Sequence, residues 1–458
     1  MKPTNRRYRR GTGDPGTGLS AGAAGLWPGP CFTIGNQFDD PELGWEKILP
    51  NLNVHASRAA AVLIALVCVA GPAFADALKP EFRVDSYTTD DPAARLQEHP
   101  STAPLAGGGF VTAWGSWGQA CPDEPTTCGF DIFAQRFDDR GRKVGPEFQV
   151  NTDIEDTQIQ PSVAGLADGG FVILWWSRGG DWILGQRYDS RGRMLGGEFE
   201  VVRGVQQRPA VAALTGGGFV VAWTGEDRSL YGVFGQRYNW RGKRAGRQFR
   251  INAHQTLTQS GPALAARADG GFVATWSSYG QADPLDPFSA DVYARLFDRK
   301  GKRASRELRV NRTIVGHQTS IGLAAMKNDE IIVAWNARSE DQTEIVALAQ
   351  RLDRRGRRAG KERLLNGQGI GSLASLDGTG FVAAWHRNDK DGYPKDVMVR
   401  RYTRKGRPVS PAVRINDYAL KGGWSLSIAG LGKRSYVGIW ASEHPRHKGI
   451  FGRRLVKR

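Results

Sequence analysis

Residues 161–176 read PSVAGLADGGFVILWW and residues 183–202 read ILGQRYDSRGRMLGGEFEVV, and this phrase decides the fold of the chain. It returns about every 50 residues, which is the signature of a repeat architecture. Its FVxxW element ends at a tryptophan in seven copies: Trp114, Trp175, Trp223, Trp276, Trp335, Trp385 and Trp440. We therefore expect one structural unit to be repeated seven times, with these tryptophans as core anchors.

Each copy divides into four short strands, because apolar and polar residues alternate between clusters of turn residues. In the quoted copy the strands are PSVAGL, FVILW, GQRYD and EFEVV. The hairpin between the third and fourth strands contains a glycine, Gly192 in this copy, since such hairpins require a positive φ. Arg187 recurs in the third strand of most copies, so we expect it to serve a repeated packing or hydrogen-bonding role.

A four-stranded meander repeated radially is the blade of a propeller. We predict an all-β fold, a seven-bladed β-propeller of four-stranded antiparallel blades. The seventh copy stops after its third strand, at residues 452–456, and its missing fourth strand matches EFRVD at residues 81–85. We expect this N-terminal strand to complete the C-terminal blade, because the pairing closes the ring and removes an exposed sheet edge.

Residues 58–76, RAAAVLIALVCVAGPAFAD, have the pattern of a secretory signal peptide, with cleavage expected after Ala75. The apolar run is shorter than a membrane-spanning helix requires, so we expect no transmembrane span in the mature chain. The predicted organisation is a disordered extension or mis-assigned start at 1–53, a signal peptide at 54–75 and the propeller at 76–458. The mature protein is predicted to be secreted or periplasmic.

Two cysteines, Cys121 and Cys128, remain after the predicted processing. A lone close pair in an exported chain indicates a disulfide that staples one loop. A metal site would need further His or Cys ligands nearby, and the segment between the two cysteines offers none. We therefore predict a structural disulfide, no metal site and no cofactor.

The sequence carries a formal net charge of +17, and its cations concentrate in the hairpins between third and fourth strands. Such a cluster attracts polyanions, so we predict contact with an acidic glycan, lipopolysaccharide or another polyanion. A protein partner is a further alternative, and so is a bland role in which solvated cations protect outer strands from edge pairing. The predicted polyanion-binding residues, called the basic rim below, are Arg142, Arg193, Lys243, Lys302, Arg355, Arg357 and Arg407.

The loops between second and third strands vary in length and carry aromatic and acidic residues. Variable loops on a rigid scaffold often bind ligands, although packing over the outer strands would explain the same rings. Two of the loop carboxylates could form a glycosidase pair, but such a pair is defined by a distance that the sequence does not give. The predicted ligand-binding aromatics are Trp117, Trp182, Tyr231, Tyr279 and Tyr393.

The phrase DGGFVVAW…GQRFD…G…EFxVN resembles that of secreted bacterial propeller-repeat proteins over residues 79–458. The resemblance implies the architecture and carries little function with it. No G-x-S-x-G, H-E-x-x-H or phosphate-binding glycine loop stands in the sequence, and we predict no catalytic residue. The predicted function is a non-enzymatic, extracytoplasmic binding or scaffold propeller. The alternative is a glycan-active hydrolase or lyase with loop carboxylates at the mouth of the central funnel.

Overall fold

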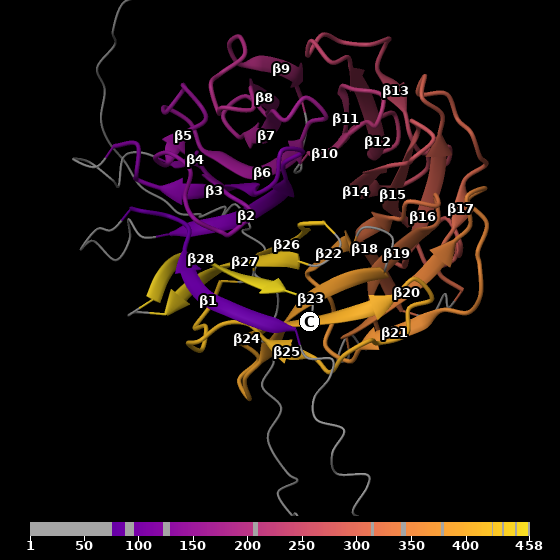
Figure 1. Cartoon of the computed structure of the whole chain (residues 1–458). Helices are drawn as coiled ribbons and strands as arrows, with labels where there is room; N and C mark the ends of the chain where they lie inside the picture. The colour runs from indigo at the N-terminus through magenta and orange to yellow at the C-terminus, as the bar shows by residue number, and fades with distance from the viewer. Residues whose placement is uncertain are drawn as a thin grey trace, which may run out of the picture. The chain divides into compact units, whose positions relative to one another are not determined.

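The computed structural model describes residues 76–458 except for 88–95, 122–128, 205–208, 313–315, 340–344, 377–379, 424, 433–434, 445–446 and 457–458. The described residues form seven antiparallel sheets of four strands each, arranged radially (Figure 1). The predicted seven-bladed β-propeller is therefore confirmed. The predicted extension, signal peptide and cleavage site all lie outside the described residues.

The first strand of each sheet lies innermost, around the centre of the ring, and the fourth lies outermost (Figure 1). Blade 1 consists of β2 (Gln97–Pro104), β3 (Phe110–Trp117), β4 (Phe130–Phe137) and β5 (Phe148–Gln149). Blade 2 consists of β6 (Gln158–Gly165), β7 (Phe171–Ser177), β8 (Trp182–Tyr188) and β9 (Phe199–Val202). Blade 3 consists of β10 (Ala210–Ala213), β11 (Phe219–Glu226), β12 (Tyr231–Tyr238) and β13 (Phe249–Arg250). Blade 4 consists of β14 (Gln259–Ala266), β15 (Phe272–Tyr279), β16 (Ala290–Phe297) and β17 (Leu308–Arg309).

The remaining three blades follow the same meander. Blade 5 consists of β18 (His317–Ala325), β19 (Ile331–Arg338), β20 (Ile345–Leu352) and β21 (Arg363–Asn366). Blade 6 consists of β22 (Ser372–Leu376), β23 (Gly380–Asn388), β24 (Pro394–Thr403) and β25 (Val413–Arg414). Blade 7 consists of β26 (Leu426–Gly430), β27 (Ser435–His444), β28 (His447–Val456) and, from the other end of the chain, β1 (Ala77–Arg83).

The ring closes through the pairing of β1 with β28, as the sequence predicts. Phe82 lies opposite Gly452, and Glu81 lies opposite Arg453, in an antiparallel register. The strand covers the outer edge of the third strand of blade 7, so the N-terminal and C-terminal ends of the propeller hold one sheet together.

Aromatic residues of the repeated phrase pack between neighbouring blades. Phe148, in the fourth strand of blade 1, lies 5.2 Å from Tyr188 in blade 2, and Phe171 stacks on the same Tyr188 at 4.7 Å. The predicted anchor Trp175 is fully buried in a cluster that includes Val111 of blade 1. The core is therefore a series of layers between blades, which explains why the same aromatic positions recur in the sequence.

Polar residues of the phrase also join neighbouring blades. Arg187 of blade 2 donates to the carbonyl oxygen of Trp240 in blade 3 at 2.8 Å. Glu147 of blade 1 accepts the backbone N–H of Ser86, just after the fourth strand of blade 7, at 2.7 Å. The expected hydrogen-bonding role is confirmed for Arg187 and for the equivalent Arg136 of blade 1, and the glutamate of the EFxVN element has an equivalent role.

The asparagine of the EFxVN element satisfies a backbone group within its own blade. Asn151 Oδ1 accepts the N–H of Ile132 at 2.7 Å, while its Nδ2 donates to Asp131 at 2.6 Å. Burial raises the pKa of Asp131 to about 6, against the lowering effect of the hydrogen bond from Asn151.

Candidate functional site

The meander places alternate connections of each blade on opposite ends of the ring. The turns between first and second strands and the hairpins between third and fourth strands share one end, called the hairpin face. The loops between second and third strands and the links into each first strand share the other, called the loop face. This division separates the two groups of residues that the sequence singled out.

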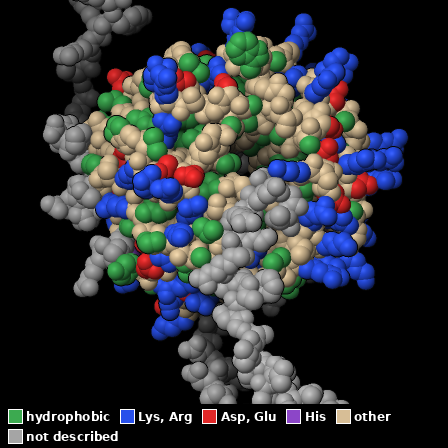
Figure 2. All heavy atoms as spheres, viewed as in Figure 1, with side chains coloured by type: hydrophobic (Ala, Val, Ile, Leu, Met, Phe, Trp, Pro, Cys, Tyr) green, Lys and Arg blue, Asp and Glu red, His purple; other side chains and the backbone are tan. Residues whose placement is uncertain are grey.

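All seven residues of the basic rim lie exposed on the hairpin face, where the sequence places them. Lys and Arg side chains gather around the outer edge of the ring, whereas the middle of the visible face is hollowed (Figure 2). Three arginines of the rim are partly neutralised by an aspartate four residues earlier in the same hairpin. These ion pairs are Arg142–Asp138 at 2.7 Å, Arg193–Asp189 at 2.8 Å and Arg357–Asp353 at 3.0 Å.

The aspartate in each of these hairpins also organises the turn. Asp189 Oδ1 accepts the backbone N–H groups of Arg191 and Arg193, both at 2.9 Å. The backbone hydrogen bond from Arg193 lowers the pKa of Asp189, and its guanidinium lowers it further. In blade 3 the same position is Asn239, which accepts the N–H groups of Arg241 and Lys243 without adding a negative charge.

The structure does not bring the five predicted ligand-binding aromatics together. They lie on the loop face of separate blades, and none of them lines the cavities described below. Trp117 packs edge-on against Phe130, and Tyr279 packs against His317, each at 5.2 Å. The Arg203 guanidinium lies over the Trp182 ring, 4.4 Å from its centroid. The backbone of Tyr231 forms an isolated β-bridge with Thr258, and the side chain of Tyr393 is 49% exposed. Contacts within the blade account for Trp117 and Trp182, and a contact with the next blade accounts for Tyr279.

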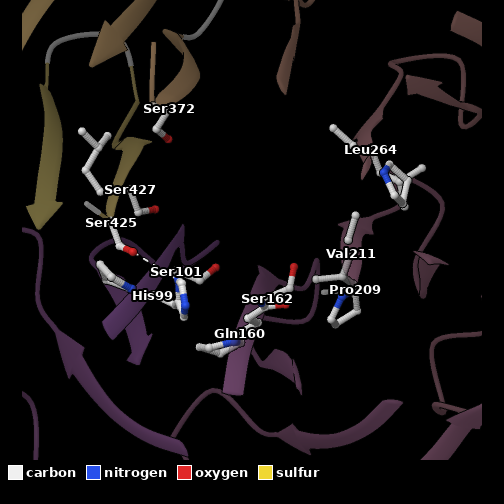
Figure 3. Close-up of a pocket in the computed structure, with 17 residues that line it drawn as sticks. His99, Ser101, Gln160, Ser162, Pro209, Val211, Leu264, Ser372, Ser425 and Ser427 are labelled. Carbon is white, nitrogen blue, oxygen red and sulfur yellow. Dashed lines mark hydrogen bonds between the residues drawn. The ribbon is translucent and has the colours of Figure 1, made fainter. Parts of the chain in front are cut away.

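A cavity of about 360 Å³ lies between the innermost strands at the centre of the ring. Its lining residues come from the beginning of those strands, so it opens toward the loop face. Serine hydroxyls with His99 and Gln160 lie along one side, and Pro209, Val211 and Leu264 lie across from them (Figure 3). The cavity therefore presents a polar wall opposite an apolar wall.

Three serines of the polar wall link neighbouring blades. Ser101 accepts the N–H of Val163, Ser372 accepts that of Ile428, and Ser427 accepts that of Thr102, each at 3.1 Å. A serine hydroxyl that accepts one hydrogen bond can still donate another. The same groups can therefore hold the blades together and donate to a ligand in the cavity.

A cluster of ionisable residues lies beside the polar wall. His99 Nδ1 lies 3.1 Å from Ser425 Oγ, and His99 Nε2 lies 3.6 Å from a carboxylate oxygen of Glu98. Burial raises the pKa of Glu98, and the neighbouring Glu443 raises it further. His99 has a φ of 54°, and the equivalent Gln160 and Gly261 have φ values of 56° and 63°, so this backbone conformation belongs to the repeat.

Glu443 is one of the acidic residues in the loops between second and third strands, whereas the sequence pattern does not single out Glu98, His99 or Ser425. The available signal was the position just before the proline of the first strand, where His99, Gln160 and Gly261 differ between copies. A residue that varies at a fixed place in a repeat is a better candidate for a specific site than one that recurs.

Cys128 lies outside the described residues, so the Cys121–Cys128 disulfide stays a prediction. Within the described ranges, no group of three or more His, Cys, Asp or Glu side chains is placed to hold a metal ion. The described residues contain no apolar helix of membrane-spanning length.

No protein-family model and no curated protein matches the sequence. The fold is similar to a protein of unknown function from Dyadobacter fermentans, at 11% identity over 84% of this chain and 100% of the other, with a TM-score of 0.52. It also aligns with the polysaccharide lyase Uly1, at 9% identity over 76% of this chain and 88% of the other, with a TM-score of 0.46. A third match is a GH93 α-L-arabinofuranosidase of Fusarium graminearum, at 9% identity over 66% of this chain and 93% of the other, with a TM-score of 0.43. At these identities the likeness concerns the fold alone.

Proposed function

We propose that this propeller is a non-enzymatic binding or scaffold protein that acts outside the cytoplasm and binds an acidic polymer through its hairpin face. The observation that carries the proposal is the placement of all seven basic-rim residues, exposed, on one face of a rigid ring. Clustered cations on a fixed surface create a positive potential that captures polyanions through several contacts at once.

The location of the protein belongs to the same proposal. The pattern of residues 58–76 supports export, with removal of the segment up to Ala75. An exported protein meets acidic polysaccharides and lipopolysaccharide, and these are the polyanions that we propose as partners. The Cys121–Cys128 disulfide would suit the oxidising conditions of that environment.

A salt series with a heparin-type polymer tests the proposal. The test variant carries Lys243→Glu, Lys302→Glu, Arg355→Glu and Arg407→Glu on the hairpin face. The control variant makes the same change of charge on the loop face, at exposed Arg178, Arg228, Lys390 and Lys421. We expect wild-type binding to weaken steeply with salt and the test variant to lose affinity at least about tenfold, with the control much less affected. Salt-independent binding, or equal losses in both variants, would overturn the proposal.

A second candidate function is that of a glycan-active hydrolase or lyase at the central cavity. The observation that favours it is the position of Glu98 beside the polar wall of this cavity, where burial, and then the neighbouring Glu443, raise the pKa of its carboxyl group. A carboxylic acid beside a carboxylate is the arrangement that general acid–base cleavage of a glycosidic bond uses.

This second function predicts turnover. Release of reducing ends, or of unsaturated uronate, would be measured over a panel of glycans for the wild type, Glu98→Gln and Glu443→Gln. Activity that either substitution abolishes while the melting temperature is kept would support catalysis. The same activity in the wild type and in both variants would rule out this pair.

A further inference from the structure

A second cavity, of about 650 Å³, lies on the hairpin face between blades 3 and 4. Its walls are the turn between β10 and β11, the turn between β14 and β15, the third strand of blade 3 and the hairpin of blade 4. Its volume falls within the range of roughly 300–1,000 Å³ that is usual for small-molecule sites. The residues that line it include Thr215, Gly216, Arg237, Asp269, Arg299 and Lys300.

The charged side chains of this cavity are mostly cationic. Arg237, Arg299 and Lys300 line it, together with one carboxylate, Asp269. Asp269 is engaged at 2.8 Å by Arg267 and is therefore already neutralised. Burial lowers the pKa of Arg237, and the charge of a second nearby carboxylate, Asp298, opposes that lowering. A positive excess therefore remains for an anion to balance.

The arginine contact seen in blades 1 and 2 is not kept at this junction. Arg136 and Arg187, at the equivalent position of blades 1 and 2, donate to carbonyl oxygens of the next hairpin. Arg237 makes no such hydrogen bond within the described part of the chain, and its side chain lines the cavity instead. A partly buried guanidinium with free donors is a strong partner for a carboxylate or a sulfate.

An exposed aromatic ring stands beside the same cavity. Trp240 is 63% exposed, and its Cβ atom lies 3.5 Å from where a side chain on Gly217 would begin. Gly217 belongs to the turn that forms one wall. Arg241 lies over one face of the ring, 4.6 Å from its centroid, and the other face suits the apolar face of a sugar ring, whereas a small inorganic anion would gain nothing from it.

We infer that the cavity between blades 3 and 4 binds one anionic sugar unit, either a uronate or a sulfated sugar, through Arg237, Arg299 and Lys300, with Trp240 against the ring. The inference rests on the proposed binding of acidic polymers by the hairpin face and names a specific site within it. The rim supplies long-range attraction, and this cavity recognises a single unit of the polymer.

Titration calorimetry of the mature protein with three disaccharides tests the inference: one sulfated, one containing a uronate and one neutral. The site variant is Arg299→Glu with Lys300→Glu. The matched control is Arg404→Glu with Lys405→Glu, which makes the same change at the same two positions of the blade 6 hairpin, outside the cavity and outside the basic rim. We expect at least one anionic disaccharide to bind the wild type, at least about tenfold loss in the site variant and about twofold or less in the control.

Two further variants separate the anion contact from ring stacking. Arg237→Gln should weaken both a bound disaccharide and inorganic sulfate, whereas Trp240→Ala should weaken the disaccharide alone. Melting temperatures would verify that each variant is folded. Equal losses in the site variant and the control, or equal binding of the neutral disaccharide, would overturn the inference.

The outcome for the long polymer keeps this inference distinct from the proposed function. Salt-dependent polymer binding without binding of any anionic disaccharide would overturn the cavity and leave the rim standing. A wild-type protein that binds neither would overturn the proposed function itself.

Discussion

The ring of Phe82 lies 5.3 Å from the ring of Phe137, centroid to centroid. Phe82 belongs to β1 at the beginning of the propeller, and Phe137 ends the third strand of blade 1. Since β1 is the outermost strand of blade 7, this contact joins the last blade to the first. Closure of the ring therefore depends on packing as well as on strand pairing.

Phe82→Ala should lower the free energy of unfolding by about 2–3 kcal/mol, because it removes a half-buried ring from the layer between blades 7 and 1. Denaturant unfolding would measure the change. Leu78→Ala on the same strand is the control, and we expect a smaller effect because Leu78 is 42% exposed. Equal effects would show that the packing of Phe82 contributes nothing specific.

A buried ion pair holds the beginning of the described chain. Asp76 accepts from Arg401 of blade 6 at 2.8 Å and from the Tyr436 hydroxyl of blade 7 at 2.6 Å. Asp76→Asn should cost about 3 kcal/mol of unfolding free energy, because it leaves a buried guanidinium without its counter-charge. The exposed ion pair Arg142–Asp138 offers the comparison, and Asp138→Asn should lower the free energy of unfolding by less than about 1 kcal/mol. Similar costs would contradict the role of burial.

The serine hydrogen bonds around the central cavity predict one substitution that destabilises the protein and one that stabilises it. Ser101→Ala should cost about 1 kcal/mol, since the N–H of Val163 loses its acceptor. Blade 3 has Ala210 where blade 1 has Ser101, as their pairing with the residue before each tryptophan shows. Ala210→Ser should therefore stabilise the protein by up to about 1 kcal/mol, because it can accept the N–H of Leu264. Thermal unfolding of both variants, read in opposite directions, tests this account.

Asp131 predicts a pH dependence of stability. Burial raises its pKa to about 6. The stability that the protonated Asp131 contributes to the folded state is therefore complete below about pH 4, where the unfolded state also becomes protonated. This contribution is lost as the pH rises through about 6. Asp131→Asn keeps an acceptor for Asn151 and removes the buried charge. The melting temperature of the variant relative to the wild type should therefore increase between pH 4 and pH 7.

The control for this pH series is Asp138→Asn. Burial opposes the change, but hydrogen bonds from Arg142 and Arg140 lower the pKa of Asp138 overall. Its contribution is present above the unfolded pKa and is lost as the pH falls through the folded one. The melting temperature of this variant relative to the wild type should therefore decrease as the pH rises, opposite in sign to Asp131→Asn. The same sign in both would contradict the assignment.

The aspartates of the basic hairpins limit the positive charge of the hairpin face. Replacing Asp138, Asp189 and Asp353 by asparagine should tighten the binding of an acidic polymer and steepen its salt dependence, because each arginine partner is released. The turns should be kept, since Asn239 already serves the same purpose in blade 3. A salt series by fluorescence anisotropy would measure the slope. An unchanged slope would show that these arginines do not contact the polymer.

The repeated positions could be interpreted from sequence because each has the same environment in several blades. Trp175, Phe148 and Gly192 recur for reasons of packing and backbone conformation, and seven copies make those reasons visible. The head-to-tail closure could be predicted for the same reason, since EFRVD at 81–85 is recognisable only as a missing fourth strand.

The candidate sites depend on what does not repeat. Glu98 and Glu443 are far apart in the sequence and become neighbours only because the ring closes. Arg237 belongs to a recurring position, and its different environment arises from the two turns beside it. The loop aromatics were misleading in this respect, because Trp117 packs within its own blade and Tyr279 packs against His317 of the next blade.

The division of the propeller into a basic hairpin face and a loop face is the central claim, and hydrogen exchange with and without a sulfated polymer tests it most directly. The account predicts slower exchange in the hairpins, such as residues 138–143 and 353–358, and in the turns around Gly216 and Gly270. Slower exchange confined to the loop face, such as residues 227–230 and 389–393, would contradict it.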